Sequence, residues 1–239
     1  MVDVVSATRA VNEIHDGMTI MIGGFLGIGE PLGLIDALAH RGVSDLTLIA
    51  CVGAYPGGSG FGVGKLARGR QISRLITSHI GTDPELVRQY IGGEIDVEFN
   101  PMGTWIERIR CGGGGLGGVL TRTGLGTEIA EGRRRIEVDG QTYLLYPPLK
   151  ADFALIKAHR ADSLGNLQYR GTALNANPVM AMAAERVIAE VDEIVEVGSI
   201  PPNQVGTPQI FVDTLVTGNS PETRKQTYTD LWVGSGRLR

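Results

Sequence analysis

The sequence predicts an α/β protein with a single open, mostly parallel sheet flanked by helices. Short apolar runs bounded by turn residues alternate along the chain with segments whose apolar residues recur at helical spacing. The 239 residues suffice for one large domain, and we expect it to span residues 1–218, followed by a polar C-terminal tail over 219–239. The 35 glycines stand in short loops between apolar segments, so they do not indicate disorder.

A glycine-rich stretch between a predicted strand and a predicted helix organises the chain. Residues 16–31 read DGMTIMIGGFLGIGEP, in which 19–22 is a buried strand and Pro31 stands near the first position of a helix. Such a strand, loop and helix start form a cradle for an anion, because glycine exposes main-chain N–H groups and the helix dipole favours negative charge. The spacing is neither the dinucleotide motif nor the P-loop. The residues alone therefore indicate a phosphate-like or acyl-carrying ligand.

The remaining elements follow in chain order. We expect helices at 7–14, 32–38, 85–91, 105–111 and 179–184, and a short helix or turn at 65–70. We expect strands at 46–51, 72–78, 94–99, 152–159, 167–170 and 186–189, and a hairpin over 133–146 that turns at Asp139-Gly140. The last apolar segments stand at 194–197 and 210–216. Residues 55–64 and the glycine run that begins at Gly112 are predicted loops. The tail after Gly218 is either disordered or docks on a partner through Tyr228, Leu231 and Trp232.

Composition excludes several classes of function. The chain has 26 acidic and 22 basic side chains without a basic stripe, which argues against nucleic-acid binding. Cys51 and Cys111 are too few for a disulfide framework and lack the neighbours of a metal site, so we expect reduced thiols and no metal. The start of the chain does not resemble a signal peptide, and no segment is long enough to span a bilayer. We expect a soluble, cytoplasmic protein.

The motif around the glycine loop resembles that of a known family. An Asp-Gly pair, an apolar run, Gly-Gly-Phe, and then Gly-x-Pro after three residues are similar to the N-terminal motif of the alpha (A) subunits of family I coenzyme A transferases, which include the acetate/acetoacetate and 3-oxoacid enzymes. Further similar blocks stand at 45–49, 103–113, 121–126, 152–159, 165–167 and 193–195.

The resemblance implies how the chemistry is divided between two chains. The loop residues implied to bind CoA are Gly23, Gly24, Phe25, Leu26, Gly27, Ile28 and Gly29. The nucleophilic glutamate is implied to lie on a beta subunit, so no catalytic residue is expected here. The partner completes a heterodimer or heterotetramer, and CoA acts as an acyl-carrying substrate without a permanently bound cofactor. An oxyanion site or active-site wall is implied at Met102, Gly103, Glu107, Gly113 and Gly114.

Three positions depart from the family pattern. Met102 stands where the family has a glutamine whose amide holds the thioester oxygen, and a thioether cannot donate that hydrogen bond. Cys51-Val52 replaces asparagine, and Leu174-Asn175-Ala176-Asn177-Pro178 lacks the arginine and aromatic of Arg-Asn-Phe-Asn-Pro. Either another donor replaces the glutamine, such as an N–H group of the glycine run, or the chemistry differs. Together the departures predict an acyl substrate that is bulkier or less polar than acetate or acetoacetate.

Glu107 is a carboxylate in an otherwise apolar and basic helix, beside the glycine run. It could serve the chemistry, but the favoured interpretation is that it pairs with Arg108, Arg110 or another neighbour. The leading hypothesis for the whole chain is an alpha subunit that transfers CoA between carboxylic acids. The alternatives are a subunit of a related acyl-CoA hydrolase, which opens a ring or cleaves a C–C bond, and a noncatalytic CoA-binding scaffold.

Overall fold

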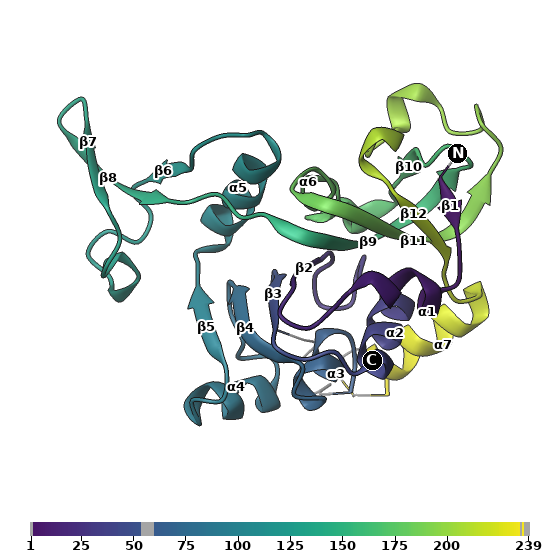
Figure 1. The fold of residues 1–239 in the computed structure, drawn as a ribbon, viewed down its shortest axis with the longest axis horizontal. Helices are drawn as coiled ribbons and strands as arrows, with labels where there is room; N and C mark the ends of the chain where they lie inside the picture. The colour runs from purple at the N-terminus through teal and green to yellow at the C-terminus, as the bar shows by residue number, and fades with distance from the viewer. Residues whose placement is uncertain (1, 54–59, 235, 237–239) are drawn as a thin grey trace.

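The main sheet is open and its strands follow the order β1-β12-β11-β9-β2-β3-β4-β5. The computed structural model describes residues 2–53, 60–234 and 236 (Figure 1). Every neighbouring pair along this order is parallel, and of the described strands in this sheet only β10, on β9, is antiparallel. The strands are β1 (Asp3–Val4), β2 (Thr19–Ile22), β3 (Leu46–Ala50), β4 (Ile72–Thr77), β5 (Asp96–Phe99), β9 (Ala151–Asp162), β10 (Leu167–Gln168), β11 (Ala184–Val195) and β12 (Thr214–Thr217). The predicted fold class is confirmed.

Helices cover both faces of this sheet. They are α1 (Ala7–Ala10), α2 (Leu32–Arg41), α3 (Val63–Arg68), α4 (Pro84–Ile91), α5 (Met102–Gly113), α6 (Asn177–Met182) and α7 (Pro221–Trp232). Short 3₁₀ turns stand at Val11–Glu13, Glu128–Ala130, Gly171–Leu174, Pro202–Gln204 and Gln209–Phe211. Alternate residues of β2 enter different cores: Ile20 and Ile22 pack with α1 to α4, whereas Met21 packs with α5 and α6. The described helices include none that is long and apolar enough to cross a membrane.

The chain changes direction across the sheet at β2. Strands β3, β4 and β5 are added outward on one side of β2, and β9, β11 and β12 are added on the other. The loops that leave neighbouring strands at such a point turn away from each other, which opens a crevice at the carboxyl ends of the strands. The glycine loop that follows β2 lies at this crevice. The topology therefore places the loop where open α/β sheets bind ligands.

A second, three-stranded antiparallel sheet projects from the body beside α5 (Figure 1). It consists of β6 (Val119–Thr121), β7 (Arg135–Val138) and β8 (Gln141–Tyr146), in the order β6-β8-β7. The predicted hairpin is confirmed, and its turn residues Asp139 and Gly140 have φ of 49° and 72°. Tyr146 is fully buried and Arg133 stacks on its ring at 4.1 Å. The sequence did not predict β6, because it lies within a glycine-rich stretch.

Several predicted boundaries were wrong. Helix α5 begins at Met102 and includes Gly112 and Gly113, which the sequence placed in a loop. Gly112 packs so closely on the next segment that a Cβ would lie 1.9 Å from the Leu149 carbonyl oxygen, so glycine is required inside the helix. Strand β11 continues to Val195, where a strand over 186–189 was expected, and α6 begins at Asn177. Of the predicted loop at 55–64, residues 55–59 lie outside the described part.

Within the polar tail, Pro221–Trp232 form helix α7, so this part of the tail is not disordered. Ser220 caps the helix by accepting a hydrogen bond from the Thr223 N–H at 3.2 Å, and Pro221 occupies the first turn. Figure 1 shows α7 beside α2, on the body of the molecule. Leu231 is buried against the same chain. The tail therefore packs on this chain itself.

Candidate functional site

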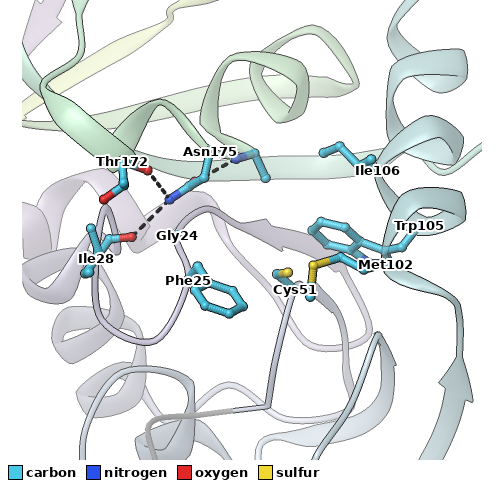
Figure 2. A pocket seen from close by; sticks show the side chains of 10 residues that line it. Gly24, Phe25, Ile28, Cys51, Met102, Trp105, Ile106, Thr172 and Asn175 are labelled. Carbon is cyan, nitrogen blue, oxygen red and sulfur yellow. Dashed lines mark hydrogen bonds between the residues drawn. The ribbon is translucent and has the colours of Figure 1, made fainter.

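A cavity of about 450 Å³ opens at the carboxyl edge of the sheet (Figure 2). Its size is within the range of about 300–1,000 Å³ that small-molecule sites occupy. Its wall comes from segments that are distant in the sequence but meet at this edge. The lining residues are Gly24, Phe25, Ile28, Cys51, Met102, Trp105, Ile106, Thr172, Asn175 and Ala176.

Each part of the wall follows the end of a strand. Gly24, Phe25 and Ile28 follow β2, and Cys51 follows β3 directly. Met102 begins α5 shortly after β5. Trp105 stands one helical turn after Met102, so both side chains face the cavity. The cavity wall is thus built from the segments that follow several strands of the parallel sheet.

The tip of the glycine loop is a tight turn over residues 25–28. Phe25 and Ile28 exchange main-chain hydrogen bonds of 3.0 and 2.9 Å. Between them, Leu26 and Gly27 both have positive φ, 49° and 84°, as in a type I′ turn. Leu26 is therefore a non-glycine residue held in the left-handed region. The turn exposes the Phe25 and Ile28 side chains, 37% and 41% accessible, at the cavity.

Two asparagines bind the glycine loop to the segment that precedes α6. Asn175 Nδ2 donates to the carbonyl oxygens of Ile28 and Thr172, at 3.1 and 3.0 Å (Figure 2). Its Oδ1 accepts from the Ala176 N–H at 2.7 Å. Asn177 Nδ2 donates to the Gly29 carbonyl at 3.1 Å. The Asn175 amide is engaged by these main-chain groups and by Asn177 Nδ2, which donates to its Oδ1 at 3.2 Å, so it leaves the cavity wall apolar in character.

The start of α2 is occupied by a carboxyl group of this chain, so it does not stand free for an anion as the motif predicts. The N–H groups of Gly33 and Leu34 donate to Glu190 Oε2, at 2.8 and 3.1 Å. Burial raises the pKa of Glu190, whereas the charge of Lys157 and these N–H groups lower it. A buried carboxylate of β11 thus occupies the position that a ligand phosphate would take.

The buried side chain of Glu30 contacts the glycine turn through a hydrogen bond. Its Oε1 accepts a 2.8 Å hydrogen bond from the Gly27 N–H, and the side chain is buried. Burial raises the pKa of Glu30 to about 7, and the Gly27 hydrogen bond opposes the shift. A Cβ on Gly24 would lie 2.3 Å from Glu30 Cγ, so only glycine fits there. The sequence contained Glu30 within the motif, but gave no signal of this role.

The two sulfur-containing residues at the cavity are not nucleophiles. Burial raises the pKa of the Cys51 thiol to about 11, so it stays protonated at neutral pH. Met102 is 46% exposed and carries no ionisable group. The described residues contain no cluster of three or more His, Cys, Asp or Glu side chains that could hold a metal ion.

Met102 and the glycines of the predicted oxyanion wall are divided between opposite ends of α5. Met102 lines the cavity and Gly103 lies next to it in the first turn of α5. Gly113 ends α5 and Gly114 caps it, and Gly113 stands eleven positions after Met102, roughly 16 Å along the helix. The glycine run therefore cannot supply the donor that Met102 lacks. Gly113 lines a separate cavity of about 430 Å³ that also includes Lys150 and Asp152.

Glu107 forms an ion pair on the surface of α5. Arg110 Nε donates to Glu107 Oε2 at 2.7 Å, and both side chains are largely exposed. Glu107 does not line the cavity. The favoured interpretation, pairing with a neighbouring arginine, is confirmed.

The three departures from the family pattern converge on one cavity. Cys51, Met102 and Ala176 all line it, although the sequence separates them by 51 and 74 positions (102 − 51 and 176 − 102). Leu174, the position of the missing arginine, is 53% exposed and does not line the cavity. Sequence reasoning missed Trp105, Ile106 and Thr172, although the spacing of Trp105 from Met102 could have indicated it.

The family model and the curated relatives compared with this chain are all coenzyme A transferases. The family model described as "Coenzyme A transferase" matches residues 4–218. The alpha subunit of acetate CoA-transferase from Escherichia coli is 50% identical over 207 residues, which are 87% of this chain and 93% of that one. The alpha subunit of acetoacetyl-CoA:acetate/butyrate CoA transferase from Clostridium acetobutylicum is 46% identical, over 84% of this chain and 91% of that one.

Solved structures share the fold. An acyl-CoA transferase from Escherichia coli, in a thioester complex with CoA, superposes with a TM-score of 0.81 at 24% identity. The match covers 90% of this chain but 47% of that longer one, so this chain spans about half of its length. A variant of the decarboxylase AibA/AibB superposes with a TM-score of 0.77 at 25% identity, over 99% of this chain and 96% of that one. The fold thus occurs with more than one reaction.

Replacement of Glu107 by Gln tests the separation of this residue from the cavity. Because the Glu107–Arg110 pair is exposed, we expect Glu107→Gln to retain CoA-transfer activity within about twofold and to lower stability by less than about 1 kcal/mol. Steady-state rates of the complex with its partner measure the first quantity. A loss of about a hundredfold or more in kcat would contradict this placement.

Replacement of Glu30 by Gln tests the buried carboxyl group under the turn. The folded-state pKa, about 7, exceeds the reference value of 4.5, so the folded protein binds more protons between these pH values. Stability is therefore highest near pH 4.5 with respect to this group, and falls by up to about 3 kcal/mol as the pH rises through 7.

Urea unfolding at pH 5.5 and pH 8 measures this loss. We expect Glu30→Gln, which keeps an oxygen for the Gly27 N–H but does not titrate, to lose less stability between the two pH values than the wild type. Some loss remains in both proteins because the pKa of Glu190 is raised as well. Equal losses in the two proteins would show that Glu30 does not carry the effect.

Proposed function

The chain belongs to the coenzyme A transferase family, and we propose that it is the alpha subunit of a heteromeric enzyme that moves CoA between carboxylic acids. The relatives reported above are CoA-transferase alpha subunits, matched over most of their length. Neither of these relatives is a hydrolase or a noncatalytic protein. The transferase hypothesis is therefore preferred to both alternatives, and a beta subunit is the expected partner.

One observation supports the proposal that the nucleophile is supplied by the partner subunit. Among the described residues, the cavity lining contains no carboxylate side chain, and its thiol, Cys51, is protonated at neutral pH. A carboxylate that attacks a thioester at this cavity therefore comes from outside the described lining. The glutamate that family resemblance assigns to the beta subunit meets this requirement. The alpha subunit then supplies the walls that hold the acyl-CoA.

The reaction proceeds in two balanced halves. The partner glutamate attacks the acyl-CoA carbonyl, the C–S bond breaks, and a mixed anhydride and CoA thiolate form. The thiolate then attacks the glutamyl carbonyl, which releases the donor carboxylate and leaves a glutamyl-CoA thioester. The acceptor acid reverses both steps. Water would hydrolyse either intermediate, and the apolar walls formed by Phe25, Trp105 and Ile106 keep it away.

The loss of the family glutamine is compensated near the same place. Helix α5 begins at Met102, and its first intrahelical hydrogen bond runs from the Trp105 N–H to the Pro101 carbonyl at 2.9 Å. A helix start leaves its first N–H groups without intrahelical partners. We place the thioester oxygen at the first turn of α5, beside Gly103, where developing negative charge meets those N–H groups.

The cavity supports a substrate with a larger, less polar acyl group than acetate. Asparagine and glutamine of the family pattern are replaced by Cys51 and Met102, and Ala176 takes the place of an aromatic residue. All three line the same cavity. We infer that its wall is less polar, and that it has more room, than the family pattern would give. We propose a cytoplasmic location, which the two cysteines without a disulfide support.

Mass spectrometry of both subunits tests the proposed division of labour. The complex is reconstituted with the protein of the neighbouring reading frame and incubated with an acyl-CoA panel without acceptor. We expect the partner to gain the mass of CoA minus water, and this chain to gain none. Hydroxylamine should then release CoA and leave a hydroxamate on the partner.

Three outcomes would contradict this assignment. A covalent adduct on this chain would place the nucleophile here. Release of free CoA without any dependence on an acceptor acid would indicate a hydrolase. Binding of acyl-CoA without adduct or turnover would indicate a scaffold.

Replacement of Ala176 by Phe tests the substrate class. We expect the wild-type complex to have a higher kcat/KM with a six-carbon acid than with acetate. Ala176→Phe fills part of the cavity, so it should lower kcat/KM for the six-carbon acid by about tenfold or more and change the value for acetate little. Leu174→Phe adds the same ring outside the cavity and serves as the matched control. A wild-type enzyme that uses acetate as well as any larger acid rejects the proposal.

A further inference from the structure

Helix α7 lies beyond the part of the chain that the family model matches. The model ends at residue 218, whereas α7 spans Pro221–Trp232. The helix returns to the body of the molecule next to α2 (Figure 1). It therefore adds contacts that the matched region does not contain, and these contacts fall on the glycine turn.

The main contact joins α7 to the middle of that turn. Tyr228 Oη donates a 2.7 Å hydrogen bond to the carbonyl oxygen of Gly27, across 201 positions of sequence. Burial, together with the charges of Glu30, Glu190 and Asp192, raises the pKa of Tyr228 to about 12, so the hydroxyl keeps its proton. The Gly27 N–H donates to Glu30 at 2.8 Å. Both main-chain polar groups of Gly27 are thus fixed, one by each neighbour.

Two further contacts hold α7 in place. Near its start, Arg224 Nη1 lies 3.0 Å from Asp192 Oδ1 on β11 and donates to the Asn219 carbonyl at 2.6 Å. Near its end, Leu231 is buried, and a Cβ on Gly27 would lie 3.3 Å from its Cδ2. The ion pair fixes one end of the helix on the sheet. The apolar contact fixes the other end on the turn.

The turn has the helix on one side and the cavity on the other. Gly27 meets Tyr228 and Leu231, whereas the flanking residues Phe25 and Ile28 line the cavity. Leu26 is held at a φ of 49°, a conformation that costs about 1 kcal/mol for a non-glycine residue. Such a turn needs outside contacts to stay in one conformation.

We propose that α7 is a strap that fixes the turn at residues 25–28 and that Tyr228 is a positioning residue for acyl-CoA binding. The hydroxyl acts through the Gly27 carbonyl, without touching the substrate. The inference rests on the proposed function, because it assigns the Phe25 and Ile28 wall to acyl-CoA. Its mechanical part, the hold of α7 on the turn, does not depend on that function.

The test compares Tyr228→Phe with the wild type in the reconstituted complex. The variant keeps the ring and removes only the hydroxyl. Hydrogen–deuterium exchange of peptides that cover residues 23–31 should be several-fold faster in the variant. KM for acyl-CoA should rise by about three- to tenfold, the value of one lost hydrogen bond, while kcat changes little. Tyr90→Phe, on the exposed face of α4, is the matched control and should change neither quantity.

The two readouts separate the possible failures. Unchanged exchange at residues 23–31 overturns the strap, whatever the kinetics. Faster exchange in Tyr228→Phe with an unchanged KM overturns the positioning role of Tyr228. The result for Ala176→Phe then tells the two failures apart. If Ala176→Phe still changes the acyl preference, only the role of Tyr228 is wrong, and if it does not, the proposed function of the cavity fails as well.

Discussion

The candidate site depends on one buried side-chain amide, that of Asn177. Its Oδ1 accepts the Lys157 N–H of β9 at 3.0 Å, and its Nδ2 donates to the carbonyls of Gly29 and Ala173 at 3.1 and 2.9 Å. Three segments that are distant in the sequence are thus joined at the crevice beside β2. A Cβ on Gly23 would lie 1.8 Å from Asn177 Oδ1, so the loop must contain glycine there. The glycines serve close packing as much as ligand approach.

This packing changes the physical meaning of the glycine motif. The motif predicts exposed N–H groups and a free helix start, yet Glu190 occupies the start of α2 and Glu30 binds the turn. The loop is a rigid wall, held by carboxylates from within the protein. What it presents to the cavity is apolar, namely Phe25 and Ile28. This wall is therefore better suited to select an acyl group by its shape and polarity than to bind a phosphate.

Local signals in the sequence were sufficient for much of the fold. The strand before the glycines, the helix after Pro31 and the hairpin at Asp139-Gly140 each depend on neighbouring residues, and the structure contains all three. The resemblance to a family also located Met102 at the cavity. Contacts between distant residues gave no local signal: Glu190 reaches Gly33 across 157 positions, and Tyr228 reaches Gly27 across 201. The sequence after Gly218 is mostly polar and likewise gave no signal of α7, because this helix packs on the body through few residues.

The central claim is that the acyl group of the substrate lies between the glycine turn and the start of α5. Photo-crosslinking tests it most directly, with an acyl-CoA that carries a diazirine on a medium-length chain, in the complex with its partner. The account predicts labelled peptides that contain Phe25 or Ile28 together with Met102 or Trp105, and less labelling when unmodified acyl-CoA competes. Labelling confined to the partner, or to the separate cavity around Lys150 and Asp152, would contradict it.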